Sequence, residues 1–171
     1  AQLFGPTLRQ IALGGANAPQ EHLRNIAALG YCVSFGYGMT ETAVTAYDGA
    51  VDMKARLSGC SGKLLPIAHA KIAETGELIV GCEAIHIGQL RDGKLIPPDL
   101  DENGMFHTGD IVRFDEKQRL HIEGRIKDVI IGASGENIYP DEIENAFTGI
   151  PGVDMMTVLG TGDKGREQVT L

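Results

Sequence analysis

Cysteine is scarce in this sequence, and its spacing excludes two classes of protein. The chain of 171 residues has three cysteines, Cys32, Cys60 and Cys82, which stand far apart and form no C-x-x-C pair. An odd number of widely spaced cysteines does not suit a disulfide scaffold or a zinc site. The pattern fits a reducing compartment, and we therefore expect a cytoplasmic location.

Long apolar runs and an excess of positive charge are also missing. No stretch approaches the length needed to span a membrane, and no basic segment followed by an apolar one opens the chain. The formal net charge is −8 at pH 7, with acidic residues spread along the sequence. This balance argues against a nucleic-acid-binding surface. We expect no nucleic-acid partner and no transmembrane segment, and the oligomeric state stays open.

The motifs of several enzyme classes are absent as well. There is no G-x-S-x-G nucleophile elbow and no H-E-x-x-H metal motif. The histidines are not spaced as metal ligands: His22, His69, His86, His107 and His121. A hydrolase or a zinc enzyme therefore has no support. The run at 36–42, G-Y-G-M-T-E-T, is not a dinucleotide fingerprint, because Glu41 stands where the third glycine is needed.

The sequence does contain the pattern of an α/β unit near its start. With 43% hydrophobic side chains, the chain can bury a core of ordinary size. Residues 8–13 predict a strand, residues 19–29 a helix that opens on a proline, and residues 33–35 a second strand. Both predicted strands run into glycines, which allow a flat ring to approach the backbone at the end of a sheet.

The remainder of the chain predicts more strand than helix. Residues 57–100 alternate apolar and polar side chains between turns, which indicates a β-rich subdomain, and we assign it no chemistry. Further on, residues 129–131 predict a short strand and residues 140–147 a helix with acidic residues in its first turn. Residues 154–159 predict another strand.

The stretch 36–42 offers three groups suited to a nucleotide. We expect a glycine-loosened loop in which Tyr37 stacks on a purine, Thr40 donates to a phosphate oxygen, and Glu41 holds a magnesium ion. A loop with a buried tyrosine and two solvated polar residues explains the same pattern and stays open.

A predicted hairpin places a carboxylate beside a guanidinium. Residues 111–114 and 120–123 alternate apolar and polar side chains, with a charged turn between them. Asp110 precedes the first strand and Arg125 follows the second, so the folded hairpin should bring them together. A carboxylate next to a planar donor suits the two hydroxyls of a ribose. An ordinary surface ion pair between two turns is the alternative.

The order of these motifs resembles the adenylate-forming acyl-CoA synthetase (acid–thiol ligase) family. The matching stretches are G-Y-G-M-T-E, F-H-T-G-D, G-R-I-K-D-V-I-I and G-E-N-I-Y-P-D-E-I-E. The resemblance implies a mixed α/β fold: an α/β unit with a β-rich, barrel-like subdomain, a hinge, and a partial small α+β C-terminal domain. The implied boundaries are 1–124 for the distal part of the large N-terminal adenylation domain, 125–128 for the hinge, and 129–171 for a truncated C-terminal subdomain.

The resemblance also implies roles for individual residues. The catalytic positions are Thr40, Glu41 as the magnesium ligand, and Lys127 as the hinge residue; without the family, Lys127 is equally well a surface lysine. Gly135 is expected to line the path of the pantetheine arm of coenzyme A. The full set of expected nucleotide- and coenzyme-binding positions is Gly14, Gly15, Ala16, Tyr37, Gly38, Thr40, Asp110, Arg125 and Gly135.

The implied activity has two steps. ATP, with Mg²⁺, activates a carboxylic acid as an acyl-AMP, and the thiol of coenzyme A then displaces AMP. The length of the loop at 131–135 resembles the long-chain fatty acid ligases and suggests a fatty acid. The chain opens at Ala1, and the family's phosphate loop and C-terminal lysine find no match, so we expect a fragment that is inactive alone. A carrier-protein-loading adenylation domain, an aryl-acid ligase and a non-catalytic nucleotide-binding module stay open.

Overall fold

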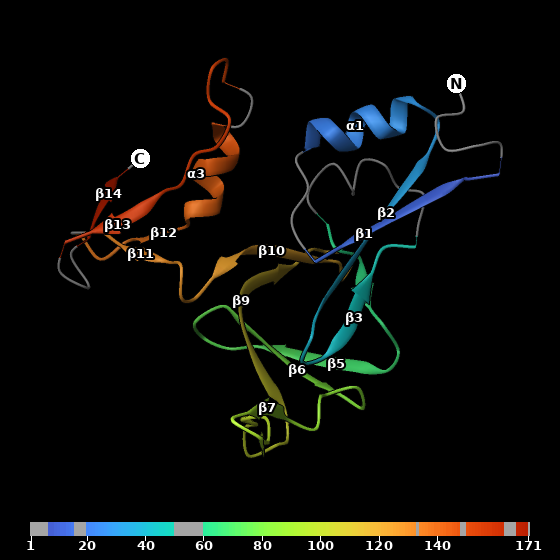
Figure 1. The fold of residues 1–171 in the computed structure, drawn as a ribbon, viewed down its shortest axis with the longest axis vertical. Helices are drawn as coiled ribbons and strands as arrows, with labels where there is room; N and C mark the ends of the chain where they lie inside the picture. The colour runs from blue at the N-terminus through green and yellow to red at the C-terminus, as the bar shows by residue number, and fades with distance from the viewer. Residues whose placement is uncertain are drawn as a thin grey trace.

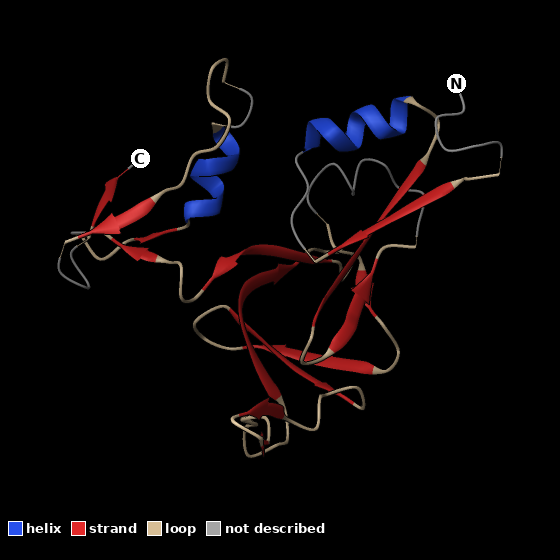
Figure 2. Ribbon diagram, viewed as in Figure 1, coloured by secondary structure: helices blue, strands red, loops and turns tan. Residues whose placement is uncertain are grey.

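The fold is built mainly from β-sheet. The computed structural model describes residues 7–15, 20–49, 60–132, 134–147, 150–162 and 167–170. Within these ranges it has two four-stranded sheets, three two-stranded sheets and the helices α1 and α3 (Figure 1). Helix α1 lies beside the first sheet and α3 beside the C-terminal strands (Figure 2). None of the helices in the described part of the chain is long and apolar enough to cross a membrane.

The first sheet contains the predicted α/β unit. Its strands lie in the order β1 (Gln10–Gly14), β2 (Cys32–Met39), β3 (Ala43–Tyr47) and β4 (Lys63–Leu64). Strands β1 and β2 are parallel, so the chain needs a crossover between them, and α1 (Gln20–Ala28) provides it. The other neighbours in this sheet are antiparallel.

The prediction of a loop at 36–42 is wrong for its first half. Strand β2 runs on to Met39 and pairs with β3, a strand that the sequence pattern did not reveal. Gly38 allows this pairing, since a Cβ there would lie 2.1 Å from the main-chain oxygen of Ala43. Glycine in a strand marks such close backbone approach. Only residues 40–42 form a turn.

The second sheet is antiparallel throughout. Its order is β10 (Leu120–Arg125), β9 (Phe106–Phe114), β6 (Glu77–Cys82) and β5 (Ala68–Ile72). The pairing of β9 with β10 confirms the predicted hairpin. Strands β7 (Gln89–Arg91) and β8 (Lys94–Ile96) form a separate small hairpin.

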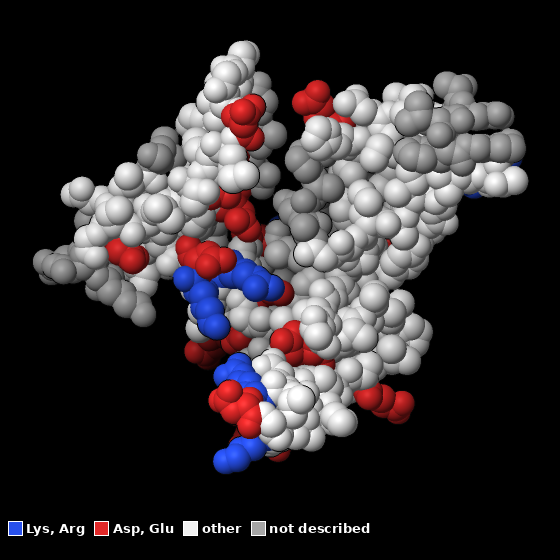
Figure 3. Space-filling model, viewed as in Figure 1, with Lys and Arg blue, Asp and Glu red and all other residues white. Residues whose placement is uncertain are grey.

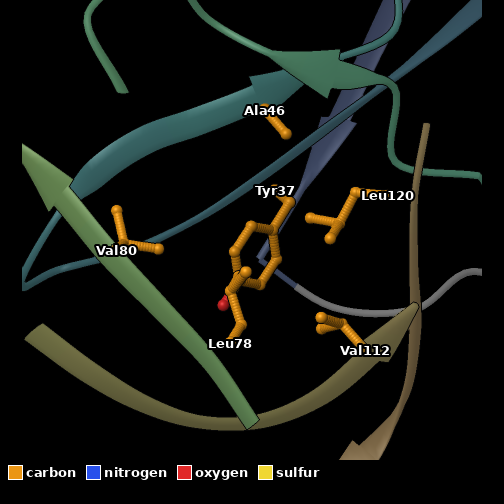
Figure 4. Close-up of a cluster of buried hydrophobic side chains, with 6 residues drawn as sticks. All are labelled: Tyr37, Ala46, Leu78, Val80, Val112 and Leu120. Carbon is orange, nitrogen blue, oxygen red and sulfur yellow. The ribbon is translucent and has the colours of Figure 1, made fainter. Parts of the chain in front are cut away.

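The main core lies between these two sheets. Tyr37 and Ala46 come from the first sheet, and the second sheet supplies Leu78, Val80, Val112 and Leu120 (Figure 4). All six are at most 7% exposed. Because burial of apolar surface is the main favourable contribution to folding, this cluster fixes β2 against β6 and β9. The placement of β2 against β9 matters for the site, since both strands carry candidate residues.

The C-terminal part consists of short elements. Strands β11 (Ile130–Ile131) and β12 (Asn137–Ile138) pair with each other, and so do β13 (Leu159–Thr161) and β14 (Gln168–Thr170). Helix α3 (Pro140–Ala146) confirms the helix predicted from its proline. The predicted strand at 154–159 is wrong except for its last residue. The Val158 amide donates to the Glu144 carboxylate at 2.8 Å, which takes it out of any strand ladder.

Candidate functional site

The site is organised by a bulge in β9. His107 pairs with Ile79 and Ile111 pairs with Glu77, so three residues of β9, at 108–110, oppose the single residue Leu78 of β6. Gly109 has φ of +74°, a backbone conformation that glycine adopts without the strain of a side chain. The ladder is therefore interrupted where Asp110 lies. Asp110 sits within β9, whereas the sequence predicted it just before the first strand of the hairpin.

Side chains replace the lost ladder bonds of this bulge. The Gly109 amide donates to Glu77 Oε1 at 3.0 Å, and the Asp110 amide donates to the Thr108 hydroxyl at 3.1 Å. The Thr108 hydroxyl in turn donates to the Leu78 carbonyl at 2.8 Å. Buried backbone groups need partners of this kind. These hydrogen bonds hold the amides of Gly109 and Asp110 and the hydroxyl of Thr108, and together they set the direction of Asp110.

Asp110 is a buried carboxylate with two partners. It is 3% exposed, and the Tyr37 hydroxyl donates to its Oδ2 at 2.6 Å. Arg125, its register partner on β10, brings Nε to within 2.8 Å of Oδ1. A carboxylate buried to this degree is tolerated only when it is paired and hydrogen-bonded. The predicted meeting of Asp110 and Arg125 at the end of the hairpin is confirmed.

Tyr37 connects the core to Asp110. Its ring packs in the core cluster, and Figure 4 shows it among Leu78, Val112 and Leu120. Burial, and next the hydrogen bond to Asp110, raise the pKa of the Tyr37 hydroxyl above its ordinary value, which keeps it protonated as a donor. The predicted stacking of the ring on a purine stays a prediction. The structure adds a second role for Tyr37, since its hydroxyl group holds the Asp110 carboxylate by a hydrogen bond.

The glycine-rich end of β1 lies next to Tyr37 in the sheet. Gly14 pairs with Gly36 in two parallel strands. The residues that follow this pair, Gly15 and Tyr37, therefore lie at the same end of the two strands. A Cβ on Gly14 would lie 3.3 Å from the Gly36 oxygen, and Gly15 has φ of +87°. The strands therefore come close in a way that suits small residues. Ala16, the third expected residue of this group, lies outside the described residues.

Thr40 and Glu41 occupy the turn that follows β2. Thr40 is exposed and Glu41 is partly buried, with Gln89 Nε2 lying 3.4 Å from Glu41 Oε1. At roughly 3.3 Å per residue, Thr40 lies about 10 Å along the chain from Tyr37. The described residues contain no group of three or more potential metal ligands. A single carboxylate still fits Mg²⁺, which usually takes one or two carboxylates and completes its shell with phosphates and water.

The stretch predicted as a hinge forms a turn. The Arg125 carbonyl accepts the amides of Asp128 and Val129, both at 3.1 Å, and Lys127 is exposed. The Ile126 amide donates to the Gly109 carbonyl at 2.8 Å, which ties this turn to the bulge. Basic and acidic side chains gather on this face where β10 leads into β11 (Figure 3).

Gly135 is not part of the cluster around Asp110. It lies in the turn between β11 and β12, has φ of +86° and is exposed. Its amide donates to the Gly132 carbonyl at 2.9 Å. The structure therefore gives a conformational reason for glycine at this position, and its expected place along the pantetheine path stays a prediction.

Sequence reasoning missed Glu77 and Thr108. The β-rich stretch that contains Glu77 is assigned no chemistry from the sequence, and Thr108 appears only as part of the F-H-T-G-D motif, without a role of its own. Glu77 opens β6 and is 32 residues from Gly109, so its contact is set by the pairing of β6 with β9. The one local signal is that Glu77 directly follows the turn glycine Gly76 and begins a strand. A carboxylate at that position can face the neighbouring strand.

An open groove lies elsewhere on the molecule. It has a volume of about 390 Å³ and is lined by Lys63, Leu64, Ala70, Lys71, Ile72, Phe114 and Gln118. It contains none of the residues predicted to bind a nucleotide. We place the candidate site at Asp110, because buried charge and convergent donors define it.

Comparison with known proteins gives consistent relatives. No family model matches the chain. A putative fatty-acid–CoA ligase, FadD11 of Mycobacterium tuberculosis, is 34% identical over 156 residues, which are 91% of this chain and 27% of the relative. The feruloyl-CoA synthase of an Amycolatopsis species is 33% identical over 172 residues, 92% of this chain and 34% of the relative. The chain thus spans between about a quarter and a third of the length of these relatives.

A solved structure shows the same arrangement of the chain. The o-succinylbenzoate CoA synthetase of Bacillus subtilis, in complex with its acyl-adenylate intermediate, superposes with a TM-score of 0.78 at 30% identity. The match covers 94% of this chain and 35% of that chain. The same enzyme in complex with ATP and a magnesium ion gives a TM-score of 0.78 at 29% identity, over 96% of this chain and 36% of that chain.

Proposed function

Because this chain is homologous to AMP-forming acyl-CoA ligases over most of its length, we propose that it carries the ribose-binding part of an adenylation site. The observation that supports this most is the buried Asp110, held on one oxygen by Tyr37 and on the other by Arg125. A buried carboxylate with defined direction suits the recognition of a diol. The complete enzyme would form an acyl-AMP from ATP and a carboxylic acid and pass the acyl group to coenzyme A.

Asp110 retains hydrogen-bonding capacity for a ligand. Each carboxylate oxygen offers two lone-pair positions, and Tyr37 and Arg125 take one on each oxygen. The remaining positions can accept the two hydroxyls of a ribose. The Arg125 side chain is 58% exposed, so its other N–H groups can donate to the same hydroxyls. Gly14, Gly15, Gly38 and the Tyr37 ring would border the adenine.

The other half of the nucleotide would reach the turn after β2. We propose that the Thr40 hydroxyl donates to a phosphate oxygen and that Glu41 holds Mg²⁺, which neutralises charge on the phosphates. Lys127 would be the hinge about which residues 129–171 turn between the two steps, and Gly135 would then face coenzyme A. The separation of Tyr37 from Thr40 along β2 is compatible with one nucleotide.

The acid itself is proposed at two levels. The loop at 131–135 supports a fatty acid of medium or long chain, as does the likeness to FadD11. The likeness to a feruloyl-CoA synthase and to an o-succinylbenzoate CoA synthetase supports an aryl acid as the second candidate. The cytoplasmic location expected from the cysteine spacing stays a prediction.

ATP–pyrophosphate exchange tests the function. The protein would be produced at the full length of its relatives and supplied with fatty acids of rising chain length and with aryl acids. We expect exchange with one of the two classes, and an Asp110→Ala variant with a KM for ATP raised about tenfold or more, since hydrogen bonds to a charged group contribute roughly 1.5–3 kcal/mol each.

Controls separate the alternatives. Asp99→Ala removes an exposed carboxylate and should leave the KM for ATP unchanged, and Asp110→Asn keeps the shape of the side chain if Asp110→Ala folds poorly. Nucleotide binding without exchange for any acid would identify a non-catalytic module. Exchange followed by transfer to a carrier-protein thiol, and not to coenzyme A, would identify a carrier-loading domain.

A further inference from the structure

We propose that Glu77 is a positioning residue for Asp110: its carboxylate anchors the bulge at 108–110 and thereby sets the direction in which Asp110 meets a ribose. This inference rests on the proposed function of Asp110. In the described part of the chain Glu77 makes no hydrogen bond to the Asp110 side chain, and we infer that it acts through the backbone of Gly109.

The two oxygens of Glu77 reach both sides of Thr108. Oε1 accepts the Gly109 amide at 3.0 Å, and Oε2 lies 2.9 Å from Nδ1 of His107. The Glu77 side chain is 12% exposed, whereas that of His107 is 48% exposed. The carboxylate is therefore held in a shielded position between two residues of β9, where charge-assisted hydrogen bonds are strong.

Gly109 needs such an anchor more than any other residue of the bulge. Glycine has the widest backbone freedom, and Gly109 occupies a conformation with positive φ. Thr108 ties the first residue of the bulge to the Leu78 carbonyl. Glu77 ties the second residue, Gly109, to β6. With both residues held, the side chain of Asp110 has a defined direction.

Gly109 is also hydrogen-bonded to the turn at 125–128. Its carbonyl accepts the Ile126 amide at 2.8 Å, while its own amide is held by Glu77. Both polar groups of one peptide residue are thus fixed, one toward β6 and the other toward the turn at 125–128. Without Glu77, we expect the Gly109 backbone to rotate, and the orientation of Asp110 relative to Arg125 to spread.

The expected effect is specific for the nucleotide. In the full-length enzyme, Glu77→Ala should raise the KM for ATP about tenfold, the loss expected for one hydrogen bond to a charged group, and leave the KM for the acid unchanged. Glu77→Gln keeps an amide oxygen that accepts the Gly109 N–H and should restore most of the affinity. Glu74→Ala removes an exposed glutamate just before β6 and serves as the matched control.

Comparing ATP with 2′-deoxy-ATP and 3′-deoxy-ATP gives the decisive measurement. If Glu77 acts through Asp110, Glu77→Ala should reduce the ratio between the KM values for deoxy-ATP and ATP. The misplaced Asp110 then no longer binds the ribose hydroxyl, so removing that hydroxyl from the nucleotide costs little affinity. An equal penalty on ATP and both analogues would overturn the inference, as would a Glu77→Gln variant as impaired as Glu77→Ala. Glu77→Asp, which withdraws the carboxylate by one methylene, carries the test if Glu77→Ala does not fold.

Asp110→Ala is the reference that separates this inference from the proposed function. If Asp110→Ala leaves discrimination between ATP and the deoxy analogues intact, the ribose role of Asp110 is wrong. If Asp110→Ala abolishes discrimination while Glu77→Ala and Glu77→Asp retain it, only the role of Glu77 is wrong.

Discussion

Replacing Tyr37 by phenylalanine removes one buried oxygen and leaves the ring in the core. The lost hydrogen bond, 2.6 Å to Asp110, has a charged acceptor, and such bonds contribute roughly 1.5–3 kcal/mol. Asp110 keeps its contact with Arg125, whose side chain is 58% exposed and only partly shielded from water. We therefore expect the free energy of unfolding to fall by about 2 kcal/mol at pH 7.

The effect should depend on pH in one direction. The pKa of Tyr37 is raised in the folded protein, first by burial and then by Asp110, whereas an unfolded tyrosine titrates near its ordinary value of about 10. Stability from the neutral phenol is fully present below pH 10 and is lost above it, because only the unfolded state then releases the proton. The difference between wild type and Tyr37→Phe should narrow above pH 10.

Urea unfolding at pH 7 and across pH 9–11 measures both effects. Tyr47→Phe is the matched control, because the Tyr47 hydroxyl accepts Gln10 Nε2 at 3.0 Å in an exposed position. Its loss should change stability by no more than about 0.5 kcal/mol. If Tyr37→Phe is as stable as Tyr47→Phe, or if its difference from wild type stays constant across pH 9–11, the hydroxyl does not hold Asp110 as described.

Three further predictions concern the scaffold. Leu78→Ala empties a fully buried position in the core cluster and should lower the free energy of unfolding by about 3 kcal/mol in urea titration; a loss below about 1 kcal/mol would contradict the packing described. Gly38→Ala places a methyl group 2.1 Å from a main-chain oxygen of β3 and should sharply lower the melting temperature, whereas Gly36→Ala, with contacts of 3.6 Å and more, should lower it less. A hydrogen bond from Lys71 lowers the pKa of Asp101 to about 2, so the stability that this pair contributes above pH 4 is lost as the pH falls from about 4 toward 2. Asp101→Asn should therefore flatten the acid side of a plot of melting temperature against pH. An unchanged acid side would show that this pair does not cause the loss of stability.

The sequence predicted the hairpin well because its determinants are local. Alternating side chains and a charged turn define β9 and β10, and Asp115 closes that turn by accepting the amides of Lys117 and Arg119. The contact between Asp110 and Arg125 follows from the register of this pair. Helix α3 was predictable for the same reason, since a proline and acidic residues mark its start.

The sequence could not predict what depends on contacts between distant segments. Strand β2 passes through Gly36 and Gly38, which disfavour a strand locally, and it forms because β3 approaches the glycines closely. The burial of Tyr37 follows from the packing of one sheet on the other. The roles of Thr40, Glu41 and Lys127 toward ligands stay predictions, because these residues lie in turns and their proposed partners are ligands, not groups of this chain.

The bulge in β9 has a consequence for changes in chain length. Residues 108–110 oppose one residue of β6, so β9 carries two residues more than regular pairing requires. Side chains along a strand alternate between its two faces, so the loss of two residues leaves every remaining apolar side chain on its own face. The loss of one residue would move the apolar side chains of the rest of the strand from the core face to the solvent face. A two-residue deletion can therefore close the sheet and remove the ribose recognition that we propose for Asp110 in a single event. Descendants of such a gene would keep the architecture and lose the proposed ribose contact, and the length of this one strand would identify them.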